Sequence, residues 1–403
     1  MSGSVTRAFL LTTIIFLDML SATLPVAQLD RFMSRLVPPG LIGFENTAKS
    51  FFVTSHFLAH VLFAFLWGAI SDRMGRRKPF IVVGLLGNGV TYLTLTLIQS
   101  LPLLYAVRFL DGAFSVMGFS LVMTCALDQS APGKVGTTMG MVTLGMLLGN
   151  ALGAPLGGVL GTASVLYPFY LGALLLFVAG GLTLLLPEVP IERRPDSVGT
   201  ALAVLNEEKF LAIPYAYSLV ERLTVGFFVG IFPLLMSSKF GSTPAQVGMY
   251  QGIFLLFFAL LSPLGGLLSD RVGRVKPLLG AMACYGVVLW GLGLANQGML
   301  FPLMALGGLL GAIFYPATIA LVGDLAPVDK RGVAMGGFNV FGSLGFAAGP
   351  FLLGLVGDSI NLSACSAVAG LFCLVLVLAS FPFFRAYRRR ARAGRGEGKA
   401  GVT

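Results

Sequence analysis

Long apolar runs alternate with short polar connections along almost the whole chain. Each run has about 20 residues, the length that an α-helix needs to cross the roughly 30 Å hydrocarbon core of a bilayer. The pattern therefore predicts membrane-spanning helices, joined by connections that hold most of the polar residues. We expect twelve spans, at about residues 8–28, 50–70, 80–99, 103–126, 136–160, 164–186, 210–236, 244–268, 278–296, 299–322, 333–356 and 362–384.

The composition agrees with a membrane protein. Hydrophobic residues make up 56% of the chain and charged residues only 11%, whereas soluble domains carry roughly 25% charged residues. We expect the first apolar run, which only Arg7 precedes among charged residues, to be a retained helix and not a signal peptide. The cysteines all lie in apolar runs, which predicts packing roles and no disulfide framework: Cys125, Cys284, Cys365 and Cys373.

The net charge of +10 is explained by topology, so no nucleic-acid partner is expected. Basic residues gather in alternate connections and the tails, for example at Arg73 to Lys78, Arg271 to Lys276 and from Arg385 onward. The opposite connections hold only Arg31, Arg35, Lys49 and Lys239. The positive-inside rule then predicts that both termini are cytoplasmic, in a multi-pass protein of the bacterial or archaeal inner membrane.

The polar segment 187–209 divides the chain into two six-helix units, residues 1–186 and 210–385. The remaining segment, 386–403, is rich in Arg, Gly and Ala, and we expect it to be a disordered basic tail. Two interpretations of this tail stay open, a topology signal and a contact with anionic lipid headgroups.

The two units repeat each other. The phrase from Gly68 to Pro79, GAISDRMGRRKP, returns as GGLLSDRVGRVKP from Gly265 to Pro277. A second pair, which starts at Asp128 and at Asp324, has nearly the same offset. Internal repeats of this kind are typical of secondary transporters, in which the substrate site lies between the repeats.

These phrases resemble the signature loop of the major facilitator superfamily, and the resemblance covers essentially the whole chain. It implies an all-α membrane protein with twelve helices in two pseudo-symmetric six-helix bundles. In that family the loop latches the bundles together in the outward-open state. The resemblance assigns this gating role to ten residues: Gly68, Asp72, Arg73, Gly75, Arg76, Asp128, Asp270, Arg271, Arg274 and Asp324. We expect Arg73 and Arg76 to pair with acids such as Asp128.

A glycine-rich stretch in the fifth span predicts close helix packing. It also resembles the motif of the drug:proton antiporter branch, to which the tetracycline exporters belong, with its proline shifted by one position. Its residues are Gly149, Gly153, Pro155, Gly157 and Gly158.

Charged residues inside spans are costly and therefore point to function. Arg108 and Asp111 are three positions apart on one helical face, so they can interact, and they resemble the family's fourth-helix motif, in which the arginine is linked to proton transfer. Asp18 resembles the first-helix acid of tetracycline-type exporters. Glu221 occupies the pseudo-symmetric position in the seventh span, beside Arg222, and we expect these two neighbours to have separate partners.

These residues suggest a mechanism for antiport. Burial favours the neutral form of a carboxyl group and a nearby arginine favours its charged form, so movement of that arginine could switch proton binding. We expect Asp18, Arg108, Asp111 and Glu221 to couple transport to protons. Internally neutralised pairs are the alternative. The expected substrate cavity consists of Asp18, His56, His60, Arg108, Tyr217, Glu221, Arg222, Tyr250, Gln251, Tyr315 and Asn339.

Together these features predict proton-coupled export of small amphipathic or lipophilic compounds. A transporter of a hydrophilic metabolite, such as a sugar or organic acid, and a lipid translocator remain alternatives. Sodium is the other possible coupling ion. The chain has no phosphate-binding loop, metal cluster or hydrolase motif, so we expect neither an enzyme nor a cofactor or metal. The expected partners are a small-molecule substrate, protons and membrane lipids, and the expected state is a monomer.

Overall fold

The computed structural model describes residues 3–40, 42–130, 135–188, 208–327 and 330–397. Twelve helices in these ranges are long and apolar enough to cross a membrane, as the apolar runs predict. The N-terminal half contains α1 (Gly3–Thr23), η1 (Val26–Gln28), α2 (Leu29–Met33), α3 (Glu45–Met74), α4 (Lys78–Leu97), α5 (Leu101–Asp128), α6 (Val135–Ala163) and α7 (Tyr167–Leu184).

The C-terminal half repeats this arrangement with one local difference. It contains η2 (Lys209–Leu211), α9 (Ala212–Gly226), η3 (Phe227–Ile231), α10 (Phe232–Phe240), α11 (Pro244–Val272), α12 (Val275–Leu294), α13 (Gln297–Leu325), α14 (Arg331–Ser359) and α15 (Leu362–Glu397). The segment η3 is a π-helical turn between α9 and α10. The Gln251 side chain donates a hydrogen bond to the Phe228 carbonyl oxygen in this turn, at 2.7 Å.

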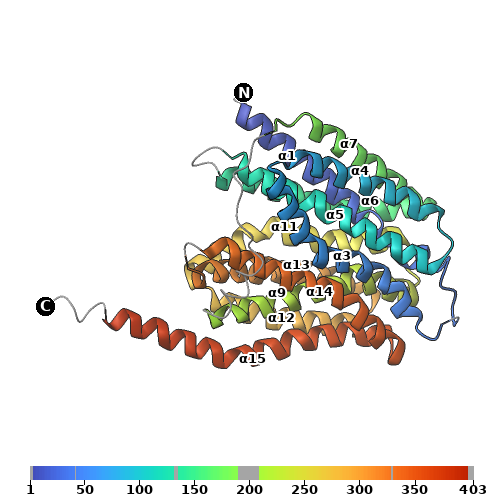
Figure 1. The fold of residues 1–403 in the computed structure, drawn as a ribbon. Helices are drawn as coiled ribbons and strands as arrows, with labels where there is room; N and C mark the ends of the chain where they lie inside the picture. The colour runs from blue at the N-terminus through green and yellow to red at the C-terminus, as the bar shows by residue number, and fades with distance from the viewer. Residues whose placement is uncertain (1–2, 41, 131–134, 189–207, 328–329, 398–403) are drawn as a thin grey trace.

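Each half is built around its own apolar core. One core gathers buried side chains from α1 to α7, and the other gathers them from α9 to α15, with Ala27 of η1 added from the first half. In Figure 1 the helices α1, α4, α6 and α7 lie on one side of the molecule, and α9, α12 and α15 lie on the other. The halves meet along two pairs of helices, α3 with α14 and α6 with α11.

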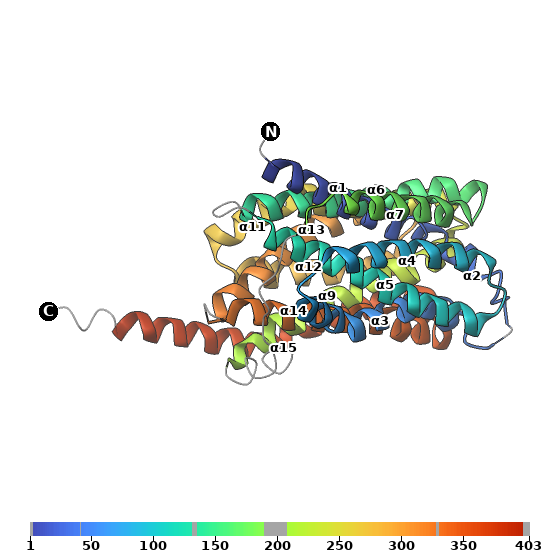
Figure 2. The same ribbon diagram turned by 45° about the horizontal axis from the view of Figure 1, so that its top comes forward.

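The C-terminal segment differs from its prediction. The composition predicts disorder from residue 386, but α15 continues as a helix to Glu397. It projects beyond the bundle in both views (Figures 1 and 2). The run from Arg385 to Ala393 contains only Arg, Ala and Tyr, without glycine or proline. Because Ala and Arg have high helix propensity, the helix continues beyond the end of its apolar part.

The two ends of the bundle differ in how closely the halves approach. At the end that carries the Gly75 and Gly273 turns, here called the signature end, a Cβ atom added to Gly68, Gly140 or Gly336 would meet no atom within 4 Å. At the opposite end, a Cβ on Gly158 would lie 2.3 Å from the Pro244 carbonyl oxygen. A Cβ on Gly354 would lie 2.3 Å from Ser50 Oγ. The halves therefore pack tightly at the opposite end, whereas the space beside these three glycines at the signature end is open.

Candidate functional site

A buried polar cluster in the N-terminal half is centred on Asp111 of α5. Its Oδ2 atom accepts hydrogen bonds from Arg108 Nη1 at 2.5 Å and from His56 Nδ1 at 2.8 Å. Thr91 Oγ1 of α4 donates to the other carboxylate oxygen at 3.0 Å. The predicted contact between Arg108 and Asp111 is therefore confirmed, and His56 and Thr91 complete the shell around the carboxylate.

Asp18 of α1 lies near this cluster without joining its hydrogen bonds. Its side chain is 1% exposed, and both carboxylate oxygens are without a hydrogen-bond partner among the described residues. Asp18 interacts electrostatically with Asp111, and the Tyr92 hydroxyl of α4 interacts electrostatically with Asp18, Arg108 and Asp111. A buried charge without a partner costs far more than a neutral group, so this position suits a carboxyl group that carries a proton.

Apolar and small residues hold the cluster in place. The Arg108 guanidinium lies over the Phe52 ring, 4.5 Å from its centroid. A Cβ atom on Gly112 would lie 2.1 Å from the His56 carbonyl oxygen, which explains why a glycine follows Asp111. Because only glycine permits this approach, it sets the distance between α3 and α5 at the level of His56.

A second polar cluster lies in the C-terminal half around Arg222 of α9. Its Nε atom binds Glu221 Oε2 at 2.8 Å, and its Nη2 atom donates to the Tyr315 hydroxyl at 2.9 Å. The prediction that Glu221 and Arg222 have separate partners is therefore wrong. Adjacent residues diverge by about 100° on a helix, but the long arginine side chain folds back to reach its neighbour.

A pair of aromatic rings joins the two clusters across the interface. Phe57 of α3 and Phe346 of α14 are stacked, with centroids 4.5 Å apart and planes 9° apart. The Arg222 guanidinium lies 5.2 Å from the Phe346 centroid, and the His60 ring lies 5.3 Å from that of Phe57. Sequence reasoning missed both phenylalanines, because the chain contains 33 of them and nothing marks these two.

The other predicted cavity residues are more scattered. The Tyr217 hydroxyl is 2.9 Å from Ser380 Oγ, in a buried contact between α9 and α15. Gln251 binds the backbone of the π-helical turn, and Tyr250 is 7% exposed. Asn339 is exposed on α14. Tyr315 alone of these residues binds a charged member of either cluster.

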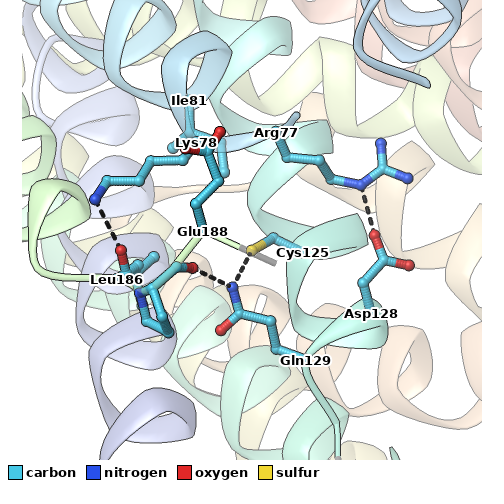
Figure 3. Close-up of a pocket in the computed structure, with 9 residues that line it drawn as sticks. Arg77, Lys78, Ile81, Cys125, Asp128, Gln129, Leu186 and Glu188 are labelled. Atoms are coloured by element: carbon cyan, nitrogen blue, oxygen red, sulfur yellow. Dashed lines mark hydrogen bonds and ion pairs between the residues drawn. The ribbon is translucent and has the colours of Figure 1, made fainter. Parts of the chain in front are cut away.

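The signature loop of the first half folds around Arg77. Its Nη2 atom lies 2.9 Å from Asp72 Oδ1 and its Nε atom lies 2.6 Å from Asp128 Oδ2. Figure 3 shows this second contact beside a pocket in which Lys78 reaches the Leu186 carbonyl oxygen. Arg76 does pair with an acid, as predicted, but its partner is Glu188 at 3.6 Å and not Asp128, and the Arg76 side chain is largely exposed.

The second signature loop uses a different register. Arg274 pairs with Asp270 and, at 3.0 Å, with Asp324. The hydrogen bonds to these two carboxylates raise the pKa of the Arg274 side chain, so the guanidinium stays charged. In the repeat Arg274 aligns with Arg76, not Arg77. The turns differ, since Gly75 adopts φ 66° and ψ 21°, whereas Gly273 adopts φ 87° and ψ 156°.

All these ion pairs lie within one half of the molecule. Within the described ranges, Arg77 binds acids of the first half and Arg274 binds acids of the second. Among the residues that the structure describes, the signature acids therefore form no ion pair between the halves. The remaining predicted members, Arg73 and Arg271, are exposed at the ends of α3 and α11.

We expect replacement of Arg77 by glutamine to destabilise the protein more than replacement of Arg76. Arg77 is 5% exposed and serves two carboxylates, and loss of the partner of a buried polar group costs about 1–3 kcal/mol. Arg76→Gln should cost no more than about 0.5 kcal/mol, as is usual at exposed positions. Thermal unfolding of both variants in detergent checks this order, and equal midpoints would contradict it.

The opposite end is held by an acid that sequence reasoning missed. Asp358 of α14 accepts hydrogen bonds from the backbone nitrogens of Asn46 and Thr47, at 2.8 and 2.9 Å. It also accepts one from Thr47 Oγ1 at 2.6 Å. The N-cap residue of α3, Phe44, has no side-chain cap of its own. Asp358 thus caps the first turn of α3 across the interface between the halves, where a negative charge is favourable.

We expect Asp358→Ala to loosen this end. Ser50 is fully buried beneath Gly354, so a Ser50→Cys variant without the four natural cysteines reports its opening. Hydrogen bonds to a charged group contribute about 1.5–3 kcal/mol, so the maleimide reaction of that cysteine should accelerate about tenfold or more. Ser359→Ala is the control, since the Ser359 hydroxyl bonds within its own helix. Unchanged reaction rates in Asp358→Ala would refute the cap.

The glycine-rich stretch of α6 packs closely, as predicted. Added Cβ atoms on Gly149, Gly153 and Gly157 would lie 2.5, 1.9 and 1.9 Å from atoms of α1 or the residue that follows it. Pro155 and Gly158 face α11 instead, where a Cβ on Gly252 would lie 2.3 Å from the Pro155 ring. One stretch thus joins α6 to its own half and to the other half.

Comparisons with known proteins agree with this architecture. The model of the Major Facilitator Superfamily matches residues 9–220 and 215–402. The class G tetracycline resistance protein of Vibrio anguillarum is 26% identical over 356 residues, which cover 85% of this chain and 88% of that protein. The multi-drug resistance efflux pump PmrA of Streptococcus pneumoniae is 26% identical over 332 residues, which cover 78% of this chain and 77% of the pump.

Solved structures share the fold at lower identity. The nucleoside transporter NupG has a TM-score of 0.78 and 16% identity, covering 94% of this chain and 99% of that one. A D-xylose-proton symporter has a TM-score of 0.75 and 14% identity, and the match covers 91% of this chain and 96% of the symporter chain. With the family model matching both halves, this chain is a transporter of the major facilitator superfamily.

Proposed function

We propose that the protein exports small amphipathic or lipophilic compounds in exchange for protons. The observation that carries this proposal is the buried Asp18 carboxyl group, which has no hydrogen-bond partner among the described residues and interacts electrostatically with Asp111, the partner of Arg108. The protein's relatives include a tetracycline resistance protein and a multi-drug efflux pump, which supports export of such compounds.

In this proposal Asp18 carries the proton and Arg108 controls its release. While Arg108 binds Asp111, Asp18 lacks a counter-ion, and a low-dielectric environment then favours its protonated form. A shift of Arg108 toward Asp18 would stabilise the carboxylate and release the proton. Glu221 is balanced by Arg222 in the other half, so we assign it the lesser role.

The aromatic pair between the halves gives the proposed substrate a suitable surface. Phe57 and Phe346 offer ring faces, and Arg222, Tyr315 and His60 add polar groups around them. Apolar surface with a few convergent polar groups is typical of small-molecule sites. An amphipathic compound could replace the ring–ring contact with its own apolar part when the halves separate.

The spacing of the halves suggests which conformation the structure represents. The signature end carries most of the basic residues, and we propose that it faces the cytoplasm, with both termini on that side. The space beside Gly68, Gly140 and Gly336 is open there, and the halves are packed at the opposite end, which supports an inward-facing conformation. The ion pairs of Arg77 and Arg274, which stay within their halves here, would then rearrange to latch the halves in the outward-facing state.

Transport by the purified protein in liposomes tests this proposal. With an imposed pH gradient, we expect uptake of tetraphenylphosphonium or tetracycline against the direction of proton flow, and no uptake of D-xylose or a lysophospholipid. Uptake of D-xylose with protons would instead establish a metabolite symporter. Movement of the lysophospholipid alone would establish a lipid translocator, and gradients of sodium in place of protons would identify sodium coupling.

A further inference from the structure

The hydrogen bonds around His56 leave one of its ring nitrogens able to accept a proton. Its Nδ1 atom and Arg108 Nη1 share one acceptor, Asp111 Oδ2, at 2.8 and 2.5 Å. Since the ionised carboxylate next to Arg108 has no proton to donate, His56 must donate from Nδ1. The hydrogen bond therefore assigns the Nδ1–H tautomer to a neutral His56 and leaves Nε2 as its open proton acceptor.

We infer that His56 is a second proton-binding residue, which replaces Arg108 as the counter-ion of Asp111 when it is protonated. This inference rests on the proposed function, because it supplies the destination for the proton that Asp18 releases. The proton leaves an Asp18 carboxyl oxygen and binds His56 Nε2, while Arg108 moves from Asp111 to Asp18.

Charge balance favours this exchange. In the first arrangement Asp18 and His56 are neutral and Arg108 balances Asp111. In the second, protonated His56 balances Asp111 and Arg108 balances ionised Asp18. Both arrangements have zero net charge, so neither leaves an unpaired charge within the buried cluster, where it would be strongly unfavourable.

The surroundings of His56 contain few other charges. Arg108 and Asp111 face it from α5, Asp18 lies on α1, and Thr91 of α4 contributes only a hydroxyl group. His60, one turn along α3, has its ring centroid 4.7 Å from that of His56. Its Nε2 atom is buried without a hydrogen-bond partner among the described residues. On the side of α14, the Phe346 ring stacks on Phe57. Phe57 contacts His60 and Phe346 contacts Arg222, so the two rings lie between these polar side chains.

Gly112 gives the exchange its geometry. Because an added Cβ would lie 2.1 Å from the His56 carbonyl oxygen, any larger residue would push α3 away from α5. His56 would then lose its reach to Asp111, although both ionisable side chains would remain present. Gly112 is therefore a positioning residue for the His56–Asp111 hydrogen bond.

Nitrogen NMR of the full-length protein in liposomes tests the inference directly, because the chain contains only 2 histidines. With ¹⁵N-labelled imidazoles, a His60→Asn variant assigns both signals. We expect neutral His56 to show the Nδ1–H tautomer. At a pH where His56 is mostly neutral in the wild type, Arg108→Gln should raise the imidazolium-to-imidazole ratio of His56 about tenfold or more. The reason is that Asp111 then lacks its other counter-ion.

Arg108→Lys is the matched control, since it keeps the positive charge and should leave His56 mostly neutral. Asp111→Asn should remove the tautomer preference and the response to Arg108→Gln. An Nε2–H tautomer in the wild type would overturn the inference, and so would a ratio within twofold of wild type in Arg108→Gln. The measurement needs no substrate, so its failure would leave the proposed export function standing, and absence of transport in the liposome panel would not alter it.

Discussion

Replacement of Asp18 by asparagine is expected to abolish substrate-driven proton movement, down to the background of liposomes without protein. Asparagine has nearly the same shape and cannot exchange a proton, so the helix packing should survive while the proposed coupling is lost. Because Asp18 is 1% exposed and its carboxylate oxygens lack partners among the described residues, the substitution removes no hydrogen bond. The thermal unfolding midpoint should stay at or above that of the wild type.

The control for this variant is Asp30→Asn, in another acid of the N-terminal half. Asp30 forms an ion pair with Lys49 at 2.8 Å, at the end opposite the signature loops. The Asp30→Asn variant should still move protons in response to substrate, even if its stability falls slightly. The assignment of Asp18 is contradicted if Asp18→Asn moves protons at the wild-type rate, or if Asp30→Asn loses them equally.

Replacement of Gly157 by valine is expected to have the largest effect on stability. An added Cβ atom there would lie 1.9 Å from the Leu24 carbonyl oxygen, which belongs to the backbone and cannot rotate away. Overpacking of a tight interface costs about 1–3 kcal/mol and sometimes more. We expect a lower thermal unfolding midpoint and loss of transport, because α1 must move away from α6 and takes Asp18 with it.

Gly140→Val provides a matched control on the same helix. A Cβ atom at Gly140 would meet nothing within 4 Å, so this variant should unfold within about 0.5 kcal/mol of the wild type. Comparison of the two variants by thermal unfolding in detergent separates close packing from a general effect of β-branched residues in α6. Equal loss of stability in both would refute the packing explanation.

The fold was predictable from the sequence because the bilayer imposes a simple pattern. A helix of about 20 apolar residues satisfies its own backbone hydrogen bonds while it crosses the hydrocarbon core. Each of the twelve predicted apolar runs corresponds to one of the twelve candidate membrane spans. Arg108 and Asp111 were also predictable as a pair, since residues three positions apart on a helix are neighbours. These are local relations, which the order of residues determines directly.

The contacts that were missed depend on geometry beyond local spacing. The repeat aligns Arg76 with Arg274, but different glycine conformations in the two turns bring Arg77 to the acids instead. The length of the Arg222 side chain lets it return to Glu221 despite their divergent directions. Asp358 binds Thr47, which lies 311 positions earlier in the chain, and no sequence pattern connects two residues so far apart.

The central claim is that substrate moves in exchange for protons, and one flux measurement tests it most directly. Liposomes containing the protein and a pH-sensitive dye are loaded with tetracycline or tetraphenylphosphonium, without an imposed pH gradient, and then diluted into substrate-free buffer. Exit of the compound should draw protons inward and acidify the interior, at a rate that depends on the amount of protein. Exit of either compound through the protein without acidification, or with alkalinisation, would contradict proton antiport.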